Sequence, residues 1–489
     1  MKTALLATLL VFSEGVAVAH GGLPVTQRIL RQGGGDTLYV PVVYWGVWVG
    51  GPGQPWKWIC EEEINTNRNR RMVLSTDGTF YTTDIRGLTI STDKGCTWKP
   101  FAGELASHLV TDLAIDPTDG ATAYATSGDS GVQNPDGGSA PPDNALWVTH
   151  DHGATFARAP GLSALAGRMF QSVRVAGPES PTAQTIYVTS VEPGATFDPE
   201  LHRSTDGGQT FTTTPITYTL DGIVPHAVEV MAIDPRDPQV IYVRAFMNAI
   251  ADGGEIAKQA LLRSIDGGAT FAELLNQDGV LTPSGQSHGI DDVAIDTTRG
   301  RVLVATSKGL LTGADPGDAP AVTLAPMSSL STAQCVDVHK GSVYACSSDY
   351  MPDFAALAES DDGAQSFHSI LNYVDTVGPV DCPAGTPVGD TCPLYWEMYG
   401  SQLGISFTDG GMPISDGGME PPHPKSGCGC QLGGASRGGS PAALAFIGLA
   451  LLLMLAARSA GRKGPPYDSN SHDSAGRKGP PYDSNSRES

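Results

Sequence analysis

Basic residues are scarce in this chain. Only 30 lysines and arginines stand against 52 aspartates and glutamates, which gives a formal net charge of -22 over 489 residues. A surface this acidic repels a phosphate backbone, so nucleic acid is not an expected partner. Aromatic residues make up only 7% of the chain, whereas glycine is abundant with 60 residues. The length allows one large all-β domain with appendages.

Long apolar runs are absent between the two ends of the chain. At the N-terminus, Lys2 precedes an apolar run from Ala4 to Phe12 and the small residues Ala17-Val18-Ala19. This order is typical of a secretory signal peptide. We therefore expect residues 1–19 to be removed and the protein to be exported.

The second apolar run, residues 441–457, lies near the C-terminus. It is at the short end for a bilayer span, and Arg458, Arg462 and Lys463 follow it. By the positive-inside rule this predicts a transmembrane helix, with the C-terminus in the cytoplasm and the large domain outside. A buried helix is the alternative.

Two polar segments flank this apolar run. Residues 409–440 are rich in glycine, proline and serine, which predicts a flexible linker. Residues 458–489 contain a direct repeat of SAGRKGPPYDSNS and are expected to be disordered. The sequence suggests no function for the repeated tail.

An eight-residue motif recurs through the middle of the chain. It has the form Ser/Thr-x-Asp-x-Gly-x-Thr-aromatic, as in STDGGQTF. The aspartate accepts backbone N–H bonds in a tight turn, and the glycine supplies a positive φ. We call these segments the Asp turns and expect them to be structural. Their aspartates are Asp93, Asp151, Asp206, Asp266 and, in a worn copy, Asp362.

A second pattern fills the intervals between the Asp turns. Segments such as LAIDPTDGATAYATS, residues 113–127, join two apolar strands through an Asp/Pro/Gly turn. Together with an Asp turn this gives a four-stranded antiparallel meander, the blade of a β-propeller. Residues 20–375 are therefore predicted to form a single seven-bladed β-propeller; six or eight blades remain open, as does the strand that closes the ring. The expected blades are 39–64, 72–100, 110–158, 172–216, 227–276, 290–326 and 335–372.

Eight cysteines in an exported chain favour disulfides. Cys335 and Cys346 flank a hairpin centred on Lys340-Gly341, which places them opposite each other on neighbouring strands. The segment 376–408 is expected to be a small cap whose own two cysteines close a short loop. Six cysteines allow 15 sets of pairs, and the preferred set is Cys335–Cys346, Cys382–Cys392 and Cys60–Cys96.

The Asp turns resemble the Asp-box, or BNR, repeat of sialidase-like β-propellers. The resemblance covers most of the predicted ring and implies the fold rather than an activity. Sialidases of this class also have an Arg-Ile-Pro segment, three arginines that hold a carboxylate, and a Tyr/Glu nucleophile pair. The nearest match here, Gln27-Arg28-Ile29-Leu30, lacks the proline.

The C-terminal region resembles a second family. Cys428-Gly429-Cys430, a Gly/Ser spacer, the apolar run and Arg458 are similar to the C-terminal sorting tag of myxobacterial surface proteins. The resemblance implies processing or lipidation at Cys428 or Cys430, and a location in the cell envelope or at the outer cell surface. Without processing, the protein would be a single-pass membrane protein.

Three histidines share one register in the repeats. Each stands eight residues before the aspartate of an Ala-Ile-Asp turn, and carboxylates follow closely. Strand direction places these residues around the mouth of the central channel, on the face opposite the Asp turns. This arrangement predicts a ligand-binding site, with packing in the loops as the alternative. The site comprises His108, His226, His288, Asp112, Glu229 and Asp292.

These observations predict an exported, surface-displayed propeller that binds protein or polysaccharide, with no catalysis, no cofactor and no metal. The alternative is a glycoside hydrolase, sialidase-like or endoglucanase-like, acting on extracellular polysaccharide. Such an enzyme needs two carboxyl groups roughly 5–10 Å apart, and no sequence spacing selects a pair among Asp112, Glu229, Asp291 and Asp292. A purely structural envelope protein is the third hypothesis.

Overall fold

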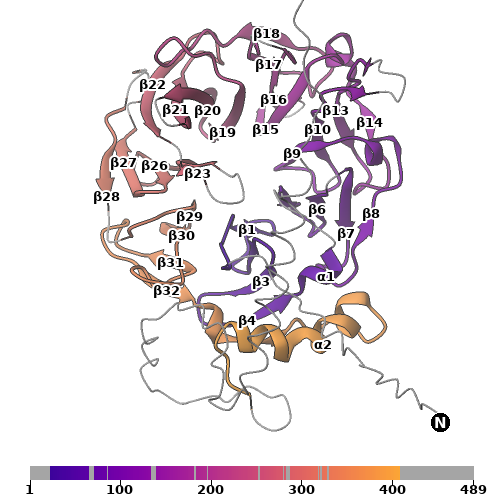
Figure 1. Cartoon of the computed structure of the whole chain (residues 1–489), viewed down its shortest axis with the longest axis vertical. Helices are drawn as coiled ribbons and strands as arrows, with labels where there is room; N and C mark the ends of the chain where they lie inside the picture. Colours follow the sequence, from indigo (N-terminus) through magenta and orange to yellow (C-terminus); the bar gives the residue numbers. More distant parts are fainter. Residues whose placement is uncertain are drawn as a thin grey trace, which may run out of the picture. The chain divides into compact units, whose positions relative to one another are not determined.

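The structure is a computed structural model of the chain (Figure 1). The chain divides after Ser415 into two units, and the described residues all belong to the first. They are residues 23–407, apart from 65–70, 85, 134–138, 181–182, 195–196, 252–253, 279, 282–286, 316, 318, 320–321 and 328–329.

Several predicted segments lie outside the described residues. These are the signal peptide at 1–19, the linker at 409–440 with Cys428 and Cys430, the transmembrane helix at 441–457 and the tail at 458–489. Within residues 23–407, as far as they are described, no helix is long and apolar enough to cross a membrane.

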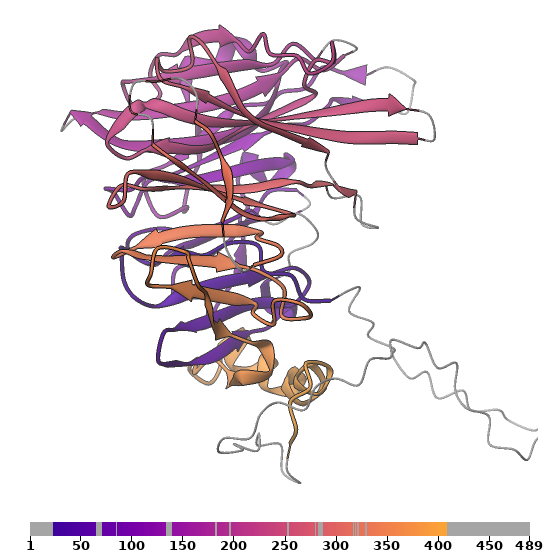
Figure 2. The same cartoon turned by 90° about the vertical axis from the view of Figure 1, so that its left-hand side faces the viewer.

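Seven β-sheets of four or five strands surround a central axis, which confirms the seven-bladed propeller (Figure 1; side view in Figure 2). Within each blade, successive strands pair antiparallel from the axis outward. The innermost strands are β1 (Leu30–Arg31), β5 (Met72–Leu74), β9 (Val110–Ile115), β15 (Met169–Ser180), β19 (Ala227–Asp234), β25 (Ile290–Asp296) and β29 (Cys335–His339).

The remaining blade strands follow in the same order. The second strands are β2 (Leu38–Val42), β6 (Phe80–Thr83), β10 (Ala123–Ser127), β16 (Ala183–Val191), β20 (Asp237–Ala251), β26 (Arg301–Thr306) and β30 (Ser342–Cys346). The third are β3 (Gly46–Gly51), β7 (Leu88–Ser91), β13 (Leu146–Thr149), β17 (Glu200–Ser204), β21 (Gly254–Ser264), β27 (Gly309–Ala314) and β31 (Leu357–Ser360). The fourth are β4 (Gln54–Ile59), β8 (Lys99–Pro100), β14 (Ala157–Arg158), β18 (Thr212–Pro215), β22 (Ala272–Asp278), β28 (Ala325–Met327) and β32 (His368–Leu371).

Short elements complete the chain. Two small hairpins, β11 (Val132–Gln133) with β12 (Ser139–Ala140) and β23 (Val280–Leu281) with β24 (Ser287–His288), lie between blade strands. The helices are α1 (Glu61–Ile64) and α2 (Pro387–Gln402), and 3-10 turns span Glu104–Ser107, Pro160–Leu165 and Tyr373–Asp375. A last strand, β33 (Thr376–Pro379), follows the seventh blade.

Antiparallel alternation gives the ring two different faces. Connections between second and third strands, and those between blades, lie on one face, which we call the loop face. Connections between first and second strands, and between third and fourth strands, lie on the other. All five Asp turns join a third strand to a fourth, so they share this second face, the Asp-turn face.

Each Asp turn is held by the same local bonds. Ser204 donates its hydroxyl to Asp206 Oδ1 at 2.7 Å, and the backbone N–H of Thr210 donates to the same oxygen at 2.9 Å. The Thr210 hydroxyl reaches Asp206 Oδ2 at 2.6 Å. These bonds, first among them the one from Thr210, lower the pKa of Asp206 to about 2. Equivalent backbone bonds recur at Asp93, Asp151, Asp266 and Asp362.

The segment expected to form a small cap packs on the propeller and also closes the ring. Strand β33 pairs parallel with β4 and becomes the fifth strand of the first blade. Helix α2 is capped by Thr386, the residue before its first turn, whose side chain accepts the backbone N–H of Gly389. It then buries Trp396 and Tyr399 against the first blade, where Trp396 lies 5.7 Å from Trp58 between ring centroids. We call residues 376–407 the closing segment.

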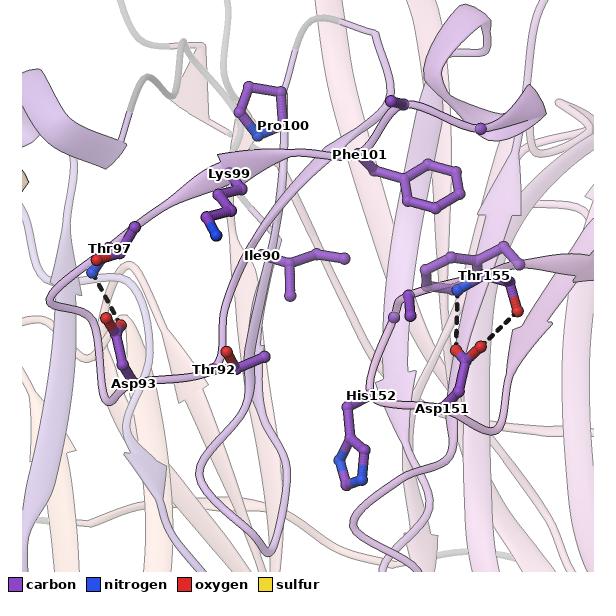
Figure 3. A pocket seen from close by; sticks show the side chains of 15 residues that line it. Ile90, Thr92, Asp93, Thr97, Lys99, Pro100, Phe101, Asp151, His152 and Thr155 are labelled. Atoms are coloured by element: carbon purple, nitrogen blue, oxygen red, sulfur yellow. Dashed lines mark hydrogen bonds between the residues drawn. The ribbon is translucent and has the colours of Figure 1, made fainter.

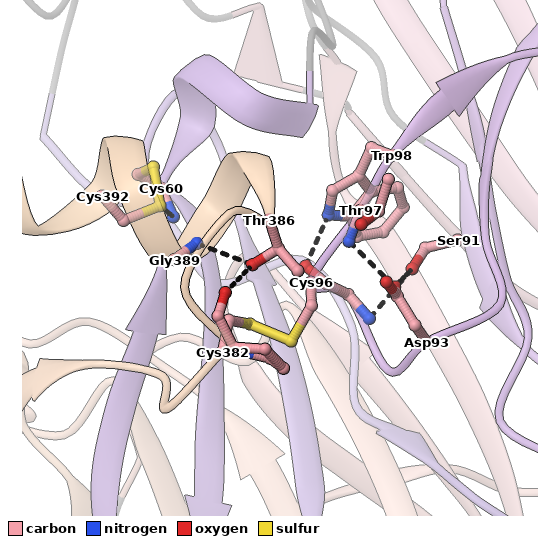
Figure 4. Close-up of a disulfide and its surroundings, with 12 residues drawn as sticks. Cys60, Ser91, Asp93, Cys96, Thr97, Trp98, Cys382, Thr386, Gly389 and Cys392 are labelled. Carbon is pink, nitrogen blue, oxygen red and sulfur yellow. Dashed lines mark hydrogen bonds between the residues drawn. A yellow bond between two sulfur atoms is a disulfide. The ribbon is translucent and has the colours of Figure 1, made fainter.

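Two disulfides fix the closing segment, and they correct the predicted pairing (Figure 4). The predicted bond between Cys335 and Cys346 is confirmed, and the two residues are directly paired on β29 and β30. The predicted pairs Cys382–Cys392 and Cys60–Cys96 are wrong. The observed bonds are Cys60–Cys392 and Cys96–Cys382. Each joins the closing segment to the first or second blade, because that segment packs beside both.

Candidate functional site

The first member of the histidine register, His108, is engaged within its own blade. Its Nδ1 lies 3.0 Å from the Asp129 carboxylate, and its ring lies 5.3 Å from the Trp147 ring. Only 12% of the His108 side chain is exposed. Asp129 also accepts the backbone N–H of Leu109. The contacts therefore tie the start of β9 to the loop between β10 and β13.

The same kind of tie occurs in other blades at the same register position. In the fourth blade Arg168 donates to the Ser190 hydroxyl at 2.7 Å and pairs with Glu200 at 3.0 Å. In the seventh, Ser331 donates its hydroxyl to Asp353 at 2.8 Å. In these blades the register position connects two loops of one blade, which is what the packing alternative expects.

The other two histidines of the register are His226 and His288. His226 is partly exposed, and its ring lies 6.0 Å from the Phe197 ring. His288 is placed by its backbone, which pairs with Val280 in the β23–β24 hairpin. The hypothesis that these histidines bind a ligand stays a prediction.

The predicted carboxylates lie deeper, along the axis, among arginines. Asp112 on β9 is fully buried and pairs with Arg174 at 2.5 Å and with Arg71 at 3.6 Å. Its Oδ2 also accepts the backbone N–H of Val173 on the next blade, at 3.1 Å. Asp112 therefore fastens the third blade to the fourth and offsets two cationic charges.

Glu229 on β19 is held by two arginines. Arg71 donates to its Oε1 at 2.7 Å, and Arg244 donates to its Oε2 at 2.5 Å. Burial alone would raise the pKa of Glu229, but Arg71 and Arg244 hold this pKa well below its usual range. At neutral pH the Glu229 carboxylate is therefore ionised.

Asp292 on β25 has backbone partners instead. Its Oδ1 accepts the N–H of Val293 at 2.9 Å, and its Oδ2 accepts the N–H of Val336 on the next blade at 3.1 Å. Burial raises the pKa of Asp292, while nearby Arg28 and these two backbone bonds oppose the rise. Both oxygens thus serve to join the sixth blade to the seventh.

One arginine at the axis has no such partner. Arg28 precedes β1 and is partly exposed. Burial, together with the nearby Arg71 and Arg174, lowers its pKa to about 10. Among the described residues Arg28 makes no ion pair or side-chain hydrogen bond, although Asp112 and Asp292 are near enough to act on it electrostatically. At neutral pH it remains a cation.

We call this group the axial cluster. It contains four guanidinium groups and three carboxyl groups from six blades, and solvent reaches its members, since 24% of Arg71 and 20% of Arg174 are exposed. Its members are Arg28, Arg71, Arg174, Arg244, Asp112, Glu229 and Asp292. The three carboxylates share a repeat pattern that is visible in the sequence, whereas the arginines occupy different positions in their repeats and were not predicted.

A groove of about 780 Å³ lies on the other side of the ring, between the Asp turns of the second and third blades (Figure 3). Asp93 and Asp151 line it, but both carboxylates are bound within their own turns. Lys99 and the rings of Phe101 and Phe156 also line it. Within the described residues, no three His, Cys, Asp or Glu side chains gather as metal ligands.

No family model matches the chain, and no curated protein matches it in sequence. Several solved structures match the chain at low similarity. A GH74 xyloglucanase from Xanthomonas campestris is 17% identical over 74% of this chain and 66% of that one, with a TM-score of 0.33. Sqt1 from Saccharomyces cerevisiae is 10% identical over 71% of this chain and 84% of that one, with a TM-score of 0.42. YCF48 bound to D1 peptide is 13% identical over 66% of this chain and 89% of that one, with a TM-score of 0.39. This chain thus spans just under two thirds of the xyloglucanase.

Proposed function

We propose that the chain is an exported, surface-displayed propeller of the Asp-box type that binds a protein or polysaccharide ligand without catalysis. Its axial cluster would take an anionic group of that ligand. The observation that carries the proposal is the unequal pairing of charges on the axis. Asp112, Glu229 and Asp292 are engaged by arginines or backbone N–H groups, whereas Arg28 has no ionic partner among the described residues.

This pairing argues against the hydrolase alternative. Hydrolysis needs one carboxyl group that donates a proton and a second that reaches the sugar or a water. Asp112 and Glu229 are each held by two arginines, and both oxygens of Asp292 join neighbouring blades. None of these three groups is available for acid–base work without breaking a contact that holds the ring.

The same pairing favours an anion as ligand. Arg28 is a partly buried cation that makes no direct ion pair, because Asp112 and Asp292 act on it only from a distance and are held by other partners. A carboxylate on the ligand would accept two charge-assisted hydrogen bonds from the guanidinium of Arg28. Uronic acids in polysaccharides and acidic side chains in proteins both carry this group.

Titration calorimetry on the purified protein tests the proposal. We expect trigalacturonate or a hexaglutamate peptide to bind, and neutral cellotriose not to bind. Arg28→Gln should weaken binding at least about tenfold, or roughly 1.4 kcal/mol. Arg86→Gln is the matched control, because Arg86 is 56% exposed on the loop face and away from the axis.

Release of reducing ends is assayed in the same samples. Binding of the uronate oligomer without new reducing ends supports the proposal. Cleavage that disappears in Asp112→Asn or Glu229→Gln would establish the hydrolase instead. Equal affinities in the wild type and Arg28→Gln would remove the axial cluster as the ligand site.

A further inference from the structure

Exposed large apolar side chains are unevenly distributed between the two faces of the ring. Apart from Val377 on the added strand β33, those of the described blade residues all lie in loop-face connections or in the segments that enter and leave the ring. The turns of the Asp-turn face contribute none among these residues. The exposed residues are Leu23, Leu109, Phe197, Val224, Tyr350, Met351, Phe354 and Val374.

Five of these eight come from segments that meet where the ring closes. Tyr350, Met351 and Phe354 belong to the loop between β30 and β31. Val374 lies in the 3-10 turn after β32, and the backbone N–H of neighbouring Tyr373 donates to Asp349 in that loop. Leu23 lies three residues before Thr26, whose hydroxyl donates to Ala356 O at the base of the loop, at 3.0 Å. We call these five residues the seam patch.

The loop that carries most of the seam patch is held rigidly. Asp353 accepts the backbone N–H of Ser331 at 2.9 Å and the hydroxyl of Ser347 at 2.6 Å. Within the loop, the backbone N–H of Phe354 donates to Tyr350 O and that of Ala355 donates to Ser348 O. The apolar side chains are therefore exposed by a fixed backbone, which lowers the entropic cost of binding a partner there.

The two carboxylates of this loop are already engaged. Asp353 is bound to the start of β29 and Asp349 to Tyr373. A polysaccharide site needs hydrogen-bonding groups beside its ring platforms, and these two carboxylates cannot supply them without releasing the loop. Apolar contact is the chemistry that the seam patch offers, and exposed apolar side chains gathered on neighbouring segments are typical of a protein interface.

The charge of this region further restricts the kind of partner that can bind the seam patch. The sequence has no lysine or arginine between Lys340 and Lys425. Over the same stretch Asp375 is exposed beside Val374, and the chain as a whole has a net charge of -22. An acidic surround repels anionic lipid and attracts basic protein surfaces.

We propose that the seam patch docks a protein partner that presents an apolar helix face flanked by lysine or arginine. The inference goes beyond the proposed function, because the seam patch includes no member of the axial cluster. Apolar contact would give the affinity, and the basic flanks would match the acidic surround.

A synthetic amphipathic helix of leucine and lysine is the probe, and a leucine–glutamate helix of the same pattern is its charge control. Fluorescence anisotropy with the full-length protein should show binding of the lysine peptide only. Tyr350→Ser/Met351→Ser/Phe354→Ser should weaken that binding at least about tenfold. Met351→Ser alone, at a side chain that is 75% exposed, should weaken it measurably with an unchanged melting temperature.

Two variants distinguish the seam patch from other surfaces of the protein that could bind the peptide. Leu394→Ser changes a side chain on α2 that is 80% exposed, and it should leave the peptide affinity unchanged, as should Arg86→Gln. Equal binding by the wild type and both seam-patch variants would overturn the proposal, because attraction would then be by charge alone. Absence of peptide binding, or binding only to phosphatidylcholine–phosphatidylglycerol vesicles, would overturn it as well.

Discussion

The Asp129 carboxylate lies 3.0 Å from Nδ1 of His108, and the two residues belong to different loops of the same blade. The corresponding position in the seventh blade shows the same relationship, with Ser331 bound to Asp353. A histidine at this register thus has a sufficient structural reason to be there. The question is whether it also contacts a ligand.

His108→Ala separates these two roles. Loss of the Asp129 contact and of the packing on Trp147 should lower the free energy of unfolding by about 1–3 kcal/mol, measured by urea denaturation. The affinity for trigalacturonate should be unchanged, because Arg28 remains. Weakened binding at unchanged stability would instead restore His108 to the ligand site.

The repeats explain how much of the fold the sequence could predict. Asp206 and its equivalents mark third-to-fourth strand turns directly, because the turn geometry is local. Blade boundaries follow from these marks. Closure of the ring was not predictable, because β33 pairs with β4 only after the whole ring has brought them together.

The disulfides show the same division between local and distant contacts. Cys335 and Cys346 face each other across one hairpin, so strand register sufficed to pair them. Cys60 and Cys392 are 332 residues apart, and a preference for short loops chose the wrong partners. The axial arginines were missed for a related reason, since Arg28, Arg71 and Arg174 meet only in the closed ring.

The two disulfides of the closing segment should be partly redundant. Replacing Cys96 and Cys382 by serine leaves the segment tied through Cys60 and Cys392, so the loss of stability should be small. Replacing all four cysteines should cost about 2–5 kcal/mol, and more than the sum of the separate pairs. Thermal unfolding of the three variants measures this difference. Strict additivity would show that the bridges act independently.

Substitutions of Asp112 and of Arg28 should have different effects on the stability of the protein. Asp112→Asn leaves Arg71 and Arg174 less compensated, and breaking a buried ion pair typically costs about 3–5 kcal/mol. Arg28→Gln removes a cation that has no ion pair among the described residues, so it should leave stability in the absence of ligand unchanged or raised. Urea denaturation of both variants is the measurement. A large loss in Arg28→Gln would mean that Arg28 is structural.

Trp98 tests the packing of an Asp turn. The indole is almost fully buried, 5.5 Å from the Phe80 ring between centroids, and its Nε1 donates to Gly95 O at 2.9 Å. Trp98→Ala should therefore lower the free energy of unfolding by roughly 3–5 kcal/mol, measured by urea denaturation. Trp98→Phe, which retains an aromatic ring, is the control and should cost less. A fully tolerated alanine would contradict the burial of the ring.

Two groups, the fully buried His202 and the partly buried Asp349, should give the stability of the ring opposite dependences on pH. Burial, and next the nearby Arg168, lowers the pKa of His202 to about 4 from 6.5. Between these values the unfolded chain binds a proton that the native protein does not, so this contribution raises stability as pH rises. Burial raises the pKa of Asp349 to about 7 from 3.8. Over that window the native protein binds the extra proton, so stability falls as pH rises.

In the wild type, the contributions of His202 and Asp349 to the pH dependence of stability oppose each other. Variants that lack one of the two groups show the contribution of the other. Asp349→Asn should leave a stability that increases from pH 4.5 to 6.5, because the His202 contribution then acts unopposed. His202→Asn should leave one that decreases over the same interval. Urea midpoints at both pH values measure the slopes, and the lowered pKa values of the Asp turns affect all three proteins alike. If both variants keep the wild-type slope, neither group is buried as the structure shows, since burial is what moves each pKa.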